Sequence, residues 1–220
     1  MFDIHLLPDL LPLFLGATAR TLLLLLGGGV GGLAIGFALN WLRQRGSAGV
    51  LKAYWAYVGL MRGLPFLILL FIAYFGLPSA GVQLSPYAAA AAALALYSGA
   101  YFAEIFRASW QAVPAGQLEA ARVMGISQAQ VFWRIQAPQA LRASLPLLAN
   151  QLVLLLKDCA LASVITYPEL AMTTGKVVSE QFIYLEPYLL LALCYWAMAL
   201  AIDGAGRRLS QRFRLKGVAR

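Results

Sequence analysis

The chain is 220 residues long, and 61% of its residues are hydrophobic while only 12% are charged. A soluble domain usually carries about 25% charged residues, so the composition excludes an ordinary water-soluble domain and indicates a bilayer protein. The formal net charge of +8 would suit nucleic acid, but the basic residues lie in the gaps between apolar runs, which excludes a nucleic-acid-binding face.

The first apolar run that can cross a membrane covers residues 21–42, which carry no charge. A helix needs about 20 such residues to cross the hydrocarbon core. Gly28, Gly32 and Gly36 recur every four residues within it, so they share one helix face and predict close packing against another helix. The stretch is glycine-rich but lacks a following Lys-Ser/Thr, which argues against a phosphate-binding loop.

Four more apolar runs predict four more spans. They cover about residues 53–77 (with Arg62-Gly63-Leu64-Pro65 inside), residues 86–103, a run that begins near residue 145 and carries Lys157 and Asp158, and about residues 187–202. A break or a re-entrant piece after Lys157 stays open. We therefore expect an all-α membrane protein of about five transmembrane helices, folded as one domain over residues 1–220.

Lys and Arg gather in every second gap between these spans, as cytoplasmic loops require. The basic gaps and tail contain Arg43, Arg45 and Lys52, then Arg107, Arg122, Arg134 and Arg142, and finally Arg207, Arg208, Arg212, Arg214, Lys216 and Arg220. This pattern predicts an external N-terminus and a cytoplasmic C-terminus. Asp3 and Asp9 near the start replace the basic residues of a signal peptide, so no cleavable signal is expected.

Residues 113–138 are unusually polar for this chain and predict two short cytoplasmic helices. Gly125 suits a left-handed C-cap of the first, while Ser127 and Gln130 form a capping-box pattern for the second. Pro138 marks its expected end. So short a first helix is marginal in water, which indicates docking against a partner, although an ordinary helical loop also fits the residues.

Five charged residues lie within or at the ends of the spans. Inserting a charged side chain at the centre of a transmembrane helix costs about 2.5–3.5 kcal/mol. Lys157 and Asp158 point about 100° apart on a helix, so they do not face each other. A structural ion network and a substrate path both remain open for them and for Arg62. Glu104 and Arg107, three residues apart, are expected to form a local structural pair. Cys159 and Cys194 lie in apolar runs without metal-ligand spacing, so we expect reduced thiols and no metal site.

The polar segment also resembles the EAA motif of ABC importer permeases. That motif reads EAA, three residues, Gly, nine residues and Ile-x-Leu-Pro, and here it is Glu119-Ala120-Ala121, Gly125, Ile135 and Pro138, with Ala137 in place of Leu. The stretches "MRGLPFLILLFIAYFGLP", "YSGAYFAEIFRASWQAVPAGQ" and "LLLKDCALASVI" resemble the polar amino-acid (histidine, glutamine, lysine-arginine-ornithine) subfamily. Cys159 and Ala160 depart from its usual Thr-Ser.

This resemblance, which extends over about residues 16–208, implies a type I importer permease in the bacterial inner membrane. Residues 113–138 would then be the coupling segment, with Glu119, Ala120, Ala121 and Gly125 docked in a separate ATPase that binds ATP and Mg. It further implies a second permease chain, a substrate-binding protein outside, no enzyme activity and no cofactor in this chain. A secondary transporter or channel for small polar solutes is the alternative, but an odd span count gives no obvious repeated halves.

Overall fold

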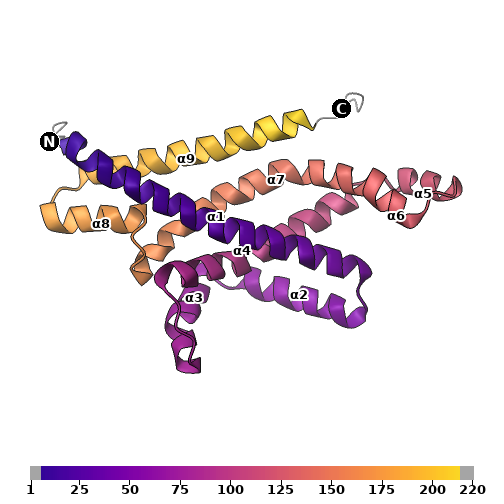
Figure 1. The fold of residues 1–220 in the computed structure, drawn as a ribbon, viewed down its shortest axis with the longest axis horizontal. Coiled ribbons are helices and arrows are strands. Elements are labelled where there is room, and N and C mark those ends of the chain that lie inside the picture. Colours follow the sequence, from indigo (N-terminus) through magenta and orange to yellow (C-terminus); the bar gives the residue numbers. More distant parts are fainter. Residues whose placement is uncertain (1–5, 214–220) are drawn as a thin grey trace.

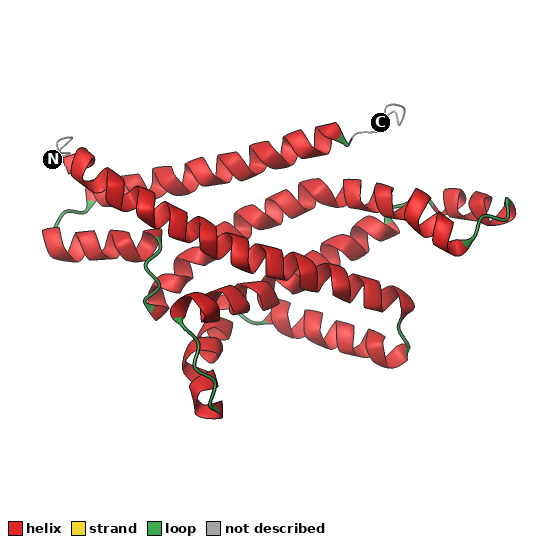
Figure 2. Ribbon diagram, viewed as in Figure 1, coloured by secondary structure: helices red, strands yellow, loops and turns green. Residues whose placement is uncertain are grey.

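The computed structural model describes residues 6–213, and helices make up almost all of them (Figure 2). The predicted charges at Asp3, Arg214, Lys216 and Arg220 lie outside this range. In chain order the elements are α1 (Leu7–Arg45), α2 (Ala48–Gly63), α3 (Phe66–Phe71), the π-helical η2 (Ile72–Gly76), the 3₁₀ turn η3 (Leu77–Ala80), α4 (Pro86–Gln111), α5 (Ala115–Val123), α6 (Gln128–Gln130), the π-helical η4 (Val131–Gln136), α7 (Ala137–Asp158), the 3₁₀ η5 (Cys159–Ile165), α8 (Leu170–Gln181) and α9 (Leu185–Arg212).

Four of the predicted spans are continuous helical stretches within the described residues: Pro8–Gln44, Pro86–Gln111, Gln128–Ile165 and Leu185–Arg212. The remaining span is broken, because α2 and the stretch Phe66–Ala80 meet at an angle of 101°. Leu64 has an extended backbone there, as is favoured for a residue before proline. The count of about five holds when this bent pair is taken as one span (Figure 1).

Two predicted boundaries are wrong. The helix that contains the first span begins at Leu7 instead of residue 21, since Arg20 is accommodated within it and donates to the Pro168 carbonyl at 3.3 Å. The fourth begins at Gln128 instead of near residue 145, and Pro138 lies in the first turn of α7 instead of ending a helix. The helix continues because Pro138 follows a π-helical turn, where the hydrogen-bond pattern changes and a missing N–H costs little.

The helical stretch that contains α7 ends after Ile165, so the break that was left open after Lys157 is present. The 3₁₀ segment η5 ends in Thr166, whose backbone is left-handed with φ of 62°. Glu169 then caps α8: its carboxylate is fully buried and accepts from the backbone N–H groups of Ala171 at 2.8 Å and Met172 at 2.7 Å. Burial raises the pKa of the Glu169 carboxyl, while these two donors oppose the shift.

The closest helix pair is α1 with α4, and glycines make it possible. Gly28, Gly32 and Gly36 lie directly against Leu94, Ser98 and Phe102 of α4, which confirms the predicted packing face. A methyl group on any of the three would collide with α4. Small residues bring two helix backbones together in this way without a deep side-chain layer. Cys159 and Cys194 are both free thiols.

Candidate coupling segment and intramembrane charges

The first helix of the polar segment, α5, ends as the sequence predicts. Gly125 has φ of 73°, the left-handed conformation that glycine adopts without steric cost. The Ile126 N–H donates to the Ala121 carbonyl and the Gly125 N–H to the Arg122 carbonyl, both at 3.0 Å. These two bonds are the Schellman pattern, so the turn after α5 has a defined geometry.

The return helix is also capped by side chains. Ser127 and Gln130 form the predicted capping box, each side chain accepting from the other residue's backbone N–H at 3.4 Å. A small apolar cluster lies under the segment and consists of Trp110, Val113, Ala137 and Ala140, with Leu118 and Phe132 packed against it. Gln139 also donates to Gln117 at 2.7 Å. The polar segment is therefore anchored to both α4 and α7.

The exposed face of α5 differs partly from the expectation. Glu119 and Ala120 are exposed, but Ala121 is 3% exposed and packs inward, so its methyl group seats the helix and leaves no surface for a partner. Val123 and Met124 are 89% and 77% exposed. This apolar tip was not predicted, and it lies at the end of the molecule remote from the described N-terminus (Figure 1). The sequence feature that could have predicted the tip is an apolar pair directly before a glycine in an otherwise polar segment.

Three of the predicted intramembrane charges come together around Glu104. Arg107 donates to both carboxylate oxygens of Glu104 at 2.9 Å, which confirms the predicted pair, and Arg62 lies 3.8 Å from the same carboxylate. Tyr54 donates to Oε1 at 2.6 Å. Glu104 therefore joins α2 to α4 through charge-assisted hydrogen bonds, which are about twice as strong as neutral ones.

Replacing Glu104 with Gln is expected to lower the free energy of unfolding by about 1–3 kcal/mol, because Tyr54 and Arg107 lose a charged acceptor in a half-buried site. The measurement is thermal unfolding of the purified protein in detergent, followed by tryptophan fluorescence. Glu180→Gln is the matched control, since its pair with Lys176 spans 3.8 Å between exposed side chains, and such pairs contribute about 1 kcal/mol or less. Equal stability of the two variants would contradict the role of Glu104.

Asp158 and Lys157 lie apart from that network. Asp158 is the last residue of α7 and half-buried, Lys157 is exposed, and neither forms an ion pair with another of the residues 6–213. Asp158 lies near Tyr97 of α4. The Tyr97 hydroxyl lies 3.1 Å from that of Tyr101, and the Arg62 guanidinium lies 5.3 Å from the centre of the Tyr101 ring.

These contacts form a polar stripe along one face of α4, defined by Tyr97, Tyr101, Glu104 and Gln111 with Arg107 beside it. Their spacing of three, four and seven residues keeps them on one side of the helix. All except the exposed Gln111 are partly buried. The stripe runs from Tyr97, past Arg62 of α2, to the C-terminal end of α4.

Comparison with known proteins decides the family. Residues 32–215 match the family described as binding-protein-dependent transport system inner membrane component. The chain belongs to this family. It is therefore a multi-pass inner-membrane permease subunit, as the EAA resemblance implied, and not an enzyme.

Several relatives and solved structures are similar to this permease. The probable amino-acid ABC transporter permease YckA of Bacillus subtilis is 44% identical over 142 residues, which are 64% of this chain and 63% of YckA. The probable glutamine permease GlnP of the same organism is 39% identical over 70% of this chain and 72% of GlnP. A solved amino acid ABC transporter with histidines has a TM-score of 0.90 at 31% identity, covering 96% of this chain and 99% of that one. The inward-facing MetNI methionine transporter shares the fold, with a TM-score of 0.80 at 20% identity.

Proposed function

We propose that this permease is a transmembrane subunit of an ATP-driven importer that moves a polar or charged amino acid by alternating access. The observation that carries the proposal is the coupling segment: a short helix held at both ends, with Glu119 exposed and an apolar tip of Val123 and Met124. An exposed apolar pair rimmed by polar residues fits a protein partner. Gly125 keeps the tip in one shape for that partner.

The partners follow from the same segment and from the family. A separate ATPase subunit, with bound ATP and Mg, takes α5 in a cleft, and two such subunits close on ATP and draw two permease chains together. The second permease is either another copy or a related chain. A substrate-binding protein delivers the solute from outside. The orientation that this requires, with the C-terminus and α5 in the cytoplasm, is supported by the arginines at that end.

The substrate class is supported by the relatives and by the polar stripe. Relatives are named for glutamine, arginine and octopine transport. A free amino acid carries a carboxylate and an ammonium group, and the stripe together with Asp158 and Lys157 offers charges of both signs. We assign the translocation path to this face of α4, with Asp158 contacting the ammonium group of the solute.

Asp158→Asn is expected to reduce amino-acid uptake at least tenfold at limiting substrate, because the amide keeps the shape but loses the charge that attracts an ammonium group. ATP-driven uptake of labelled amino acids by proteoliposomes measures it. Asp9→Asn is the matched control, since Asp9 is exposed in the first turn of α1. Unchanged uptake in Asp158→Asn, for every amino acid transported, would contradict the assigned path.

The function as a whole is tested by purifying the full chain in mild detergent and identifying what accompanies it by mass spectrometry. An ATPase in a one-to-one ratio with the permease is the expected result, with an amino acid among the extracted small molecules. Isolation of this chain alone, with uptake driven by an ion gradient and independent of ATP, would replace the proposal with a secondary transporter.

A further inference from the structure

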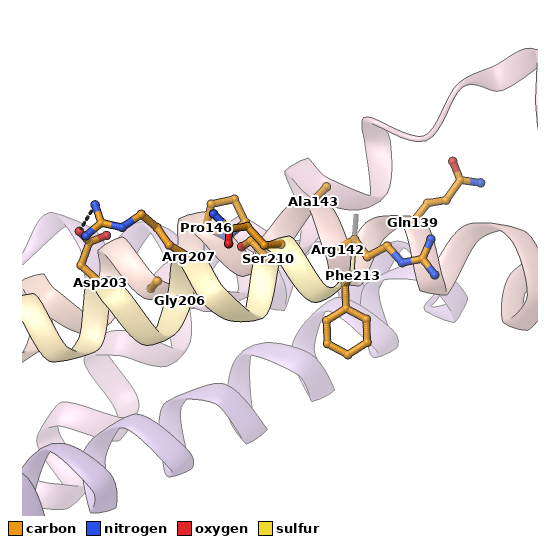
Figure 3. A pocket seen from close by; sticks show the side chains of 11 residues that line it. Gln139, Arg142, Ala143, Pro146, Asp203, Gly206, Arg207, Ser210 and Phe213 are labelled. Atoms are coloured by element: carbon orange, nitrogen blue, oxygen red, sulfur yellow. Dashed lines mark ion pairs between the residues drawn. The ribbon is translucent and has the colours of Figure 1, made fainter. Parts of the chain in front are cut away.

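A cavity of about 640 Å³ opens between α7 and α9 near the C-terminal end of α9. Arg142 of α7 lies at one end of it, and Arg207 of α9 pairs with Asp203 at 2.7 Å toward the other (Figure 3). The wall between them is made of small side chains, among them Ala149 and Gly206. The cavity thus has small side chains along its wall and polar groups at both ends. Arg142, Arg207 and Asp203 together give it a net charge of +1.

A second cavity, of about 360 Å³, adjoins the first and has an apolar wall. Phe106, Leu141, Leu145 and Leu148 line it, together with Arg142 and Phe213, which line the polar cavity too. Arg142 therefore lies at the junction of a polar space and an apolar one. A ligand that fills both must carry a negative group and a hydrocarbon part.

The depth of the polar cavity matches the lipid headgroups. The stretch of α9 between Glu186 and Asp203 is uncharged and spans about 25 Å, close to the ~30 Å of the hydrocarbon core. Residues after Asp203 therefore lie at headgroup level. The other charges on this part of α9 are Arg208 and Arg212, both exposed.

Two groups in the cavity lack a protein partner. Arg142 forms no ion pair or hydrogen bond with any of the residues 6–213, whereas Arg207 is neutralised by Asp203. The Ser210 hydroxyl is buried and likewise finds no acceptor or donor in that range. A guanidinium group binds phosphate with paired hydrogen bonds, and the Ser210 hydroxyl can donate to the same phosphate after its side chain rotates toward the cavity that Ser210 lines.

We propose that this site binds one anionic phospholipid, with its phosphate between Arg142 and Ser210 and an acyl chain in the apolar cavity against Leu148. Basic pockets between spans at the headgroup level bind anionic lipids in this way. The site lies outside the polar stripe and the coupling segment, so it does not depend on the proposed transport role.

The experiment uses the complete transporter, purified with the subunits that accompany it and placed in nanodiscs with phosphatidylglycerol diluted in phosphatidylcholine. Mass spectrometry of lipids retained after delipidation is expected to show about one phosphatidylglycerol per permease chain. Arg142→Gln should reduce retention about fivefold, the effect of one charge near the surface, and Arg142→Lys should restore most of it. Leu148→Trp, which fills the apolar cavity, should reduce it too.

Arg134→Gln is the matched control, because Arg134 is exposed and lines neither cavity. Equal retention in Arg142→Gln and Arg134→Gln would overturn the proposal. If inorganic phosphate is retained in place of lipid, and Leu148→Trp does not change that retention, the site binds free phosphate and the lipid proposal is wrong. The same variants are also compared with and without the ATPase and the second permease. If retention is equal in all variants only when one of these subunits is present, that subunit covers the groove. The groove would then be a protein interface and not a lipid site.

Discussion

Met124→Asp is expected to abolish stable association with the ATPase. Met124 is 77% exposed at the tip of α5, so the substitution costs the folded permease little, but it places a charge where we expect an apolar contact. Loss of a central apolar contact typically costs an interface about 2 kcal/mol or more, which is roughly 30-fold in affinity. Co-purification of the ATPase and ATP-driven uptake in proteoliposomes measure the two consequences.

The control for this variant is Gln128→Asp, which adds the same charge to an exposed residue at the start of α6, where a helix N-terminus tolerates it. Glu119→Lys, on the exposed face of α5, should also uncouple uptake from ATP hydrolysis by reversing a charge. Normal uptake and a full complement of ATPase in Met124→Asp would show that the tip is not the docking point.

Gly36→Ala is expected to destabilise the permease by about 1–3 kcal/mol, as overpacking of a close contact does. The added Cβ would lie 2.6 Å from the Cβ of Phe102 and 2.8 Å from the backbone N of Ala103. Because one of these is backbone, side-chain rotation cannot relieve the overlap, and α1 must move away from α4. A lower thermal unfolding midpoint in detergent measures the effect.

Gly59→Ala supplies the comparison, since a Cβ at Gly59 has no heavy atom within 4 Å. In an exposed part of a helix, alanine is favoured over glycine by about 1 kcal/mol, so this variant should match or exceed the original stability. A Gly36→Ala protein as stable as Gly59→Ala would mean that the α1–α4 contact is looser than the structure shows.

Much of this fold follows from local chemistry that a sequence displays. The glycine face of α1, the left-handed cap at Gly125 and the capping box at Ser127 each depend on residues within one or two helical turns, and all three are confirmed. The first boundary failed because an uncharged run stops at Arg20. Only the fold reveals that Arg20 reaches the Pro168 carbonyl, 148 residues away along the chain.

The sites divide in the same way. The Glu104–Arg107 pair was predictable because its members are three residues apart. The hydrogen bond from Tyr54 to Glu104 joins residues 50 apart in the chain, and no sequence pattern predicts it. Ala121 is buried because α5 is turned so that its Leu118 packs on the cluster around Trp110 and Ala121 lies on the inward side with it. That rotation, which also exposes Met124, is set by tertiary packing and not by the EAA spacing.

The glycine contact between α1 and α4 has a mechanical consequence. A side chain of α4 lies directly against each of Gly28, Gly32 and Gly36 of α1, so we expect the two helices to move together as one rigid unit. The end of α4 continues into α5 through the short turn around Val113 and Pro114, and Leu118 of α5 packs on the cluster around Trp110. If α5 docks on an ATPase as we propose, a displacement of α5 would be transmitted to α1 and α4 together, whereas α9, whose apolar stretch is only 6% buried, contacts α7 where Gly206 lies against Ala149.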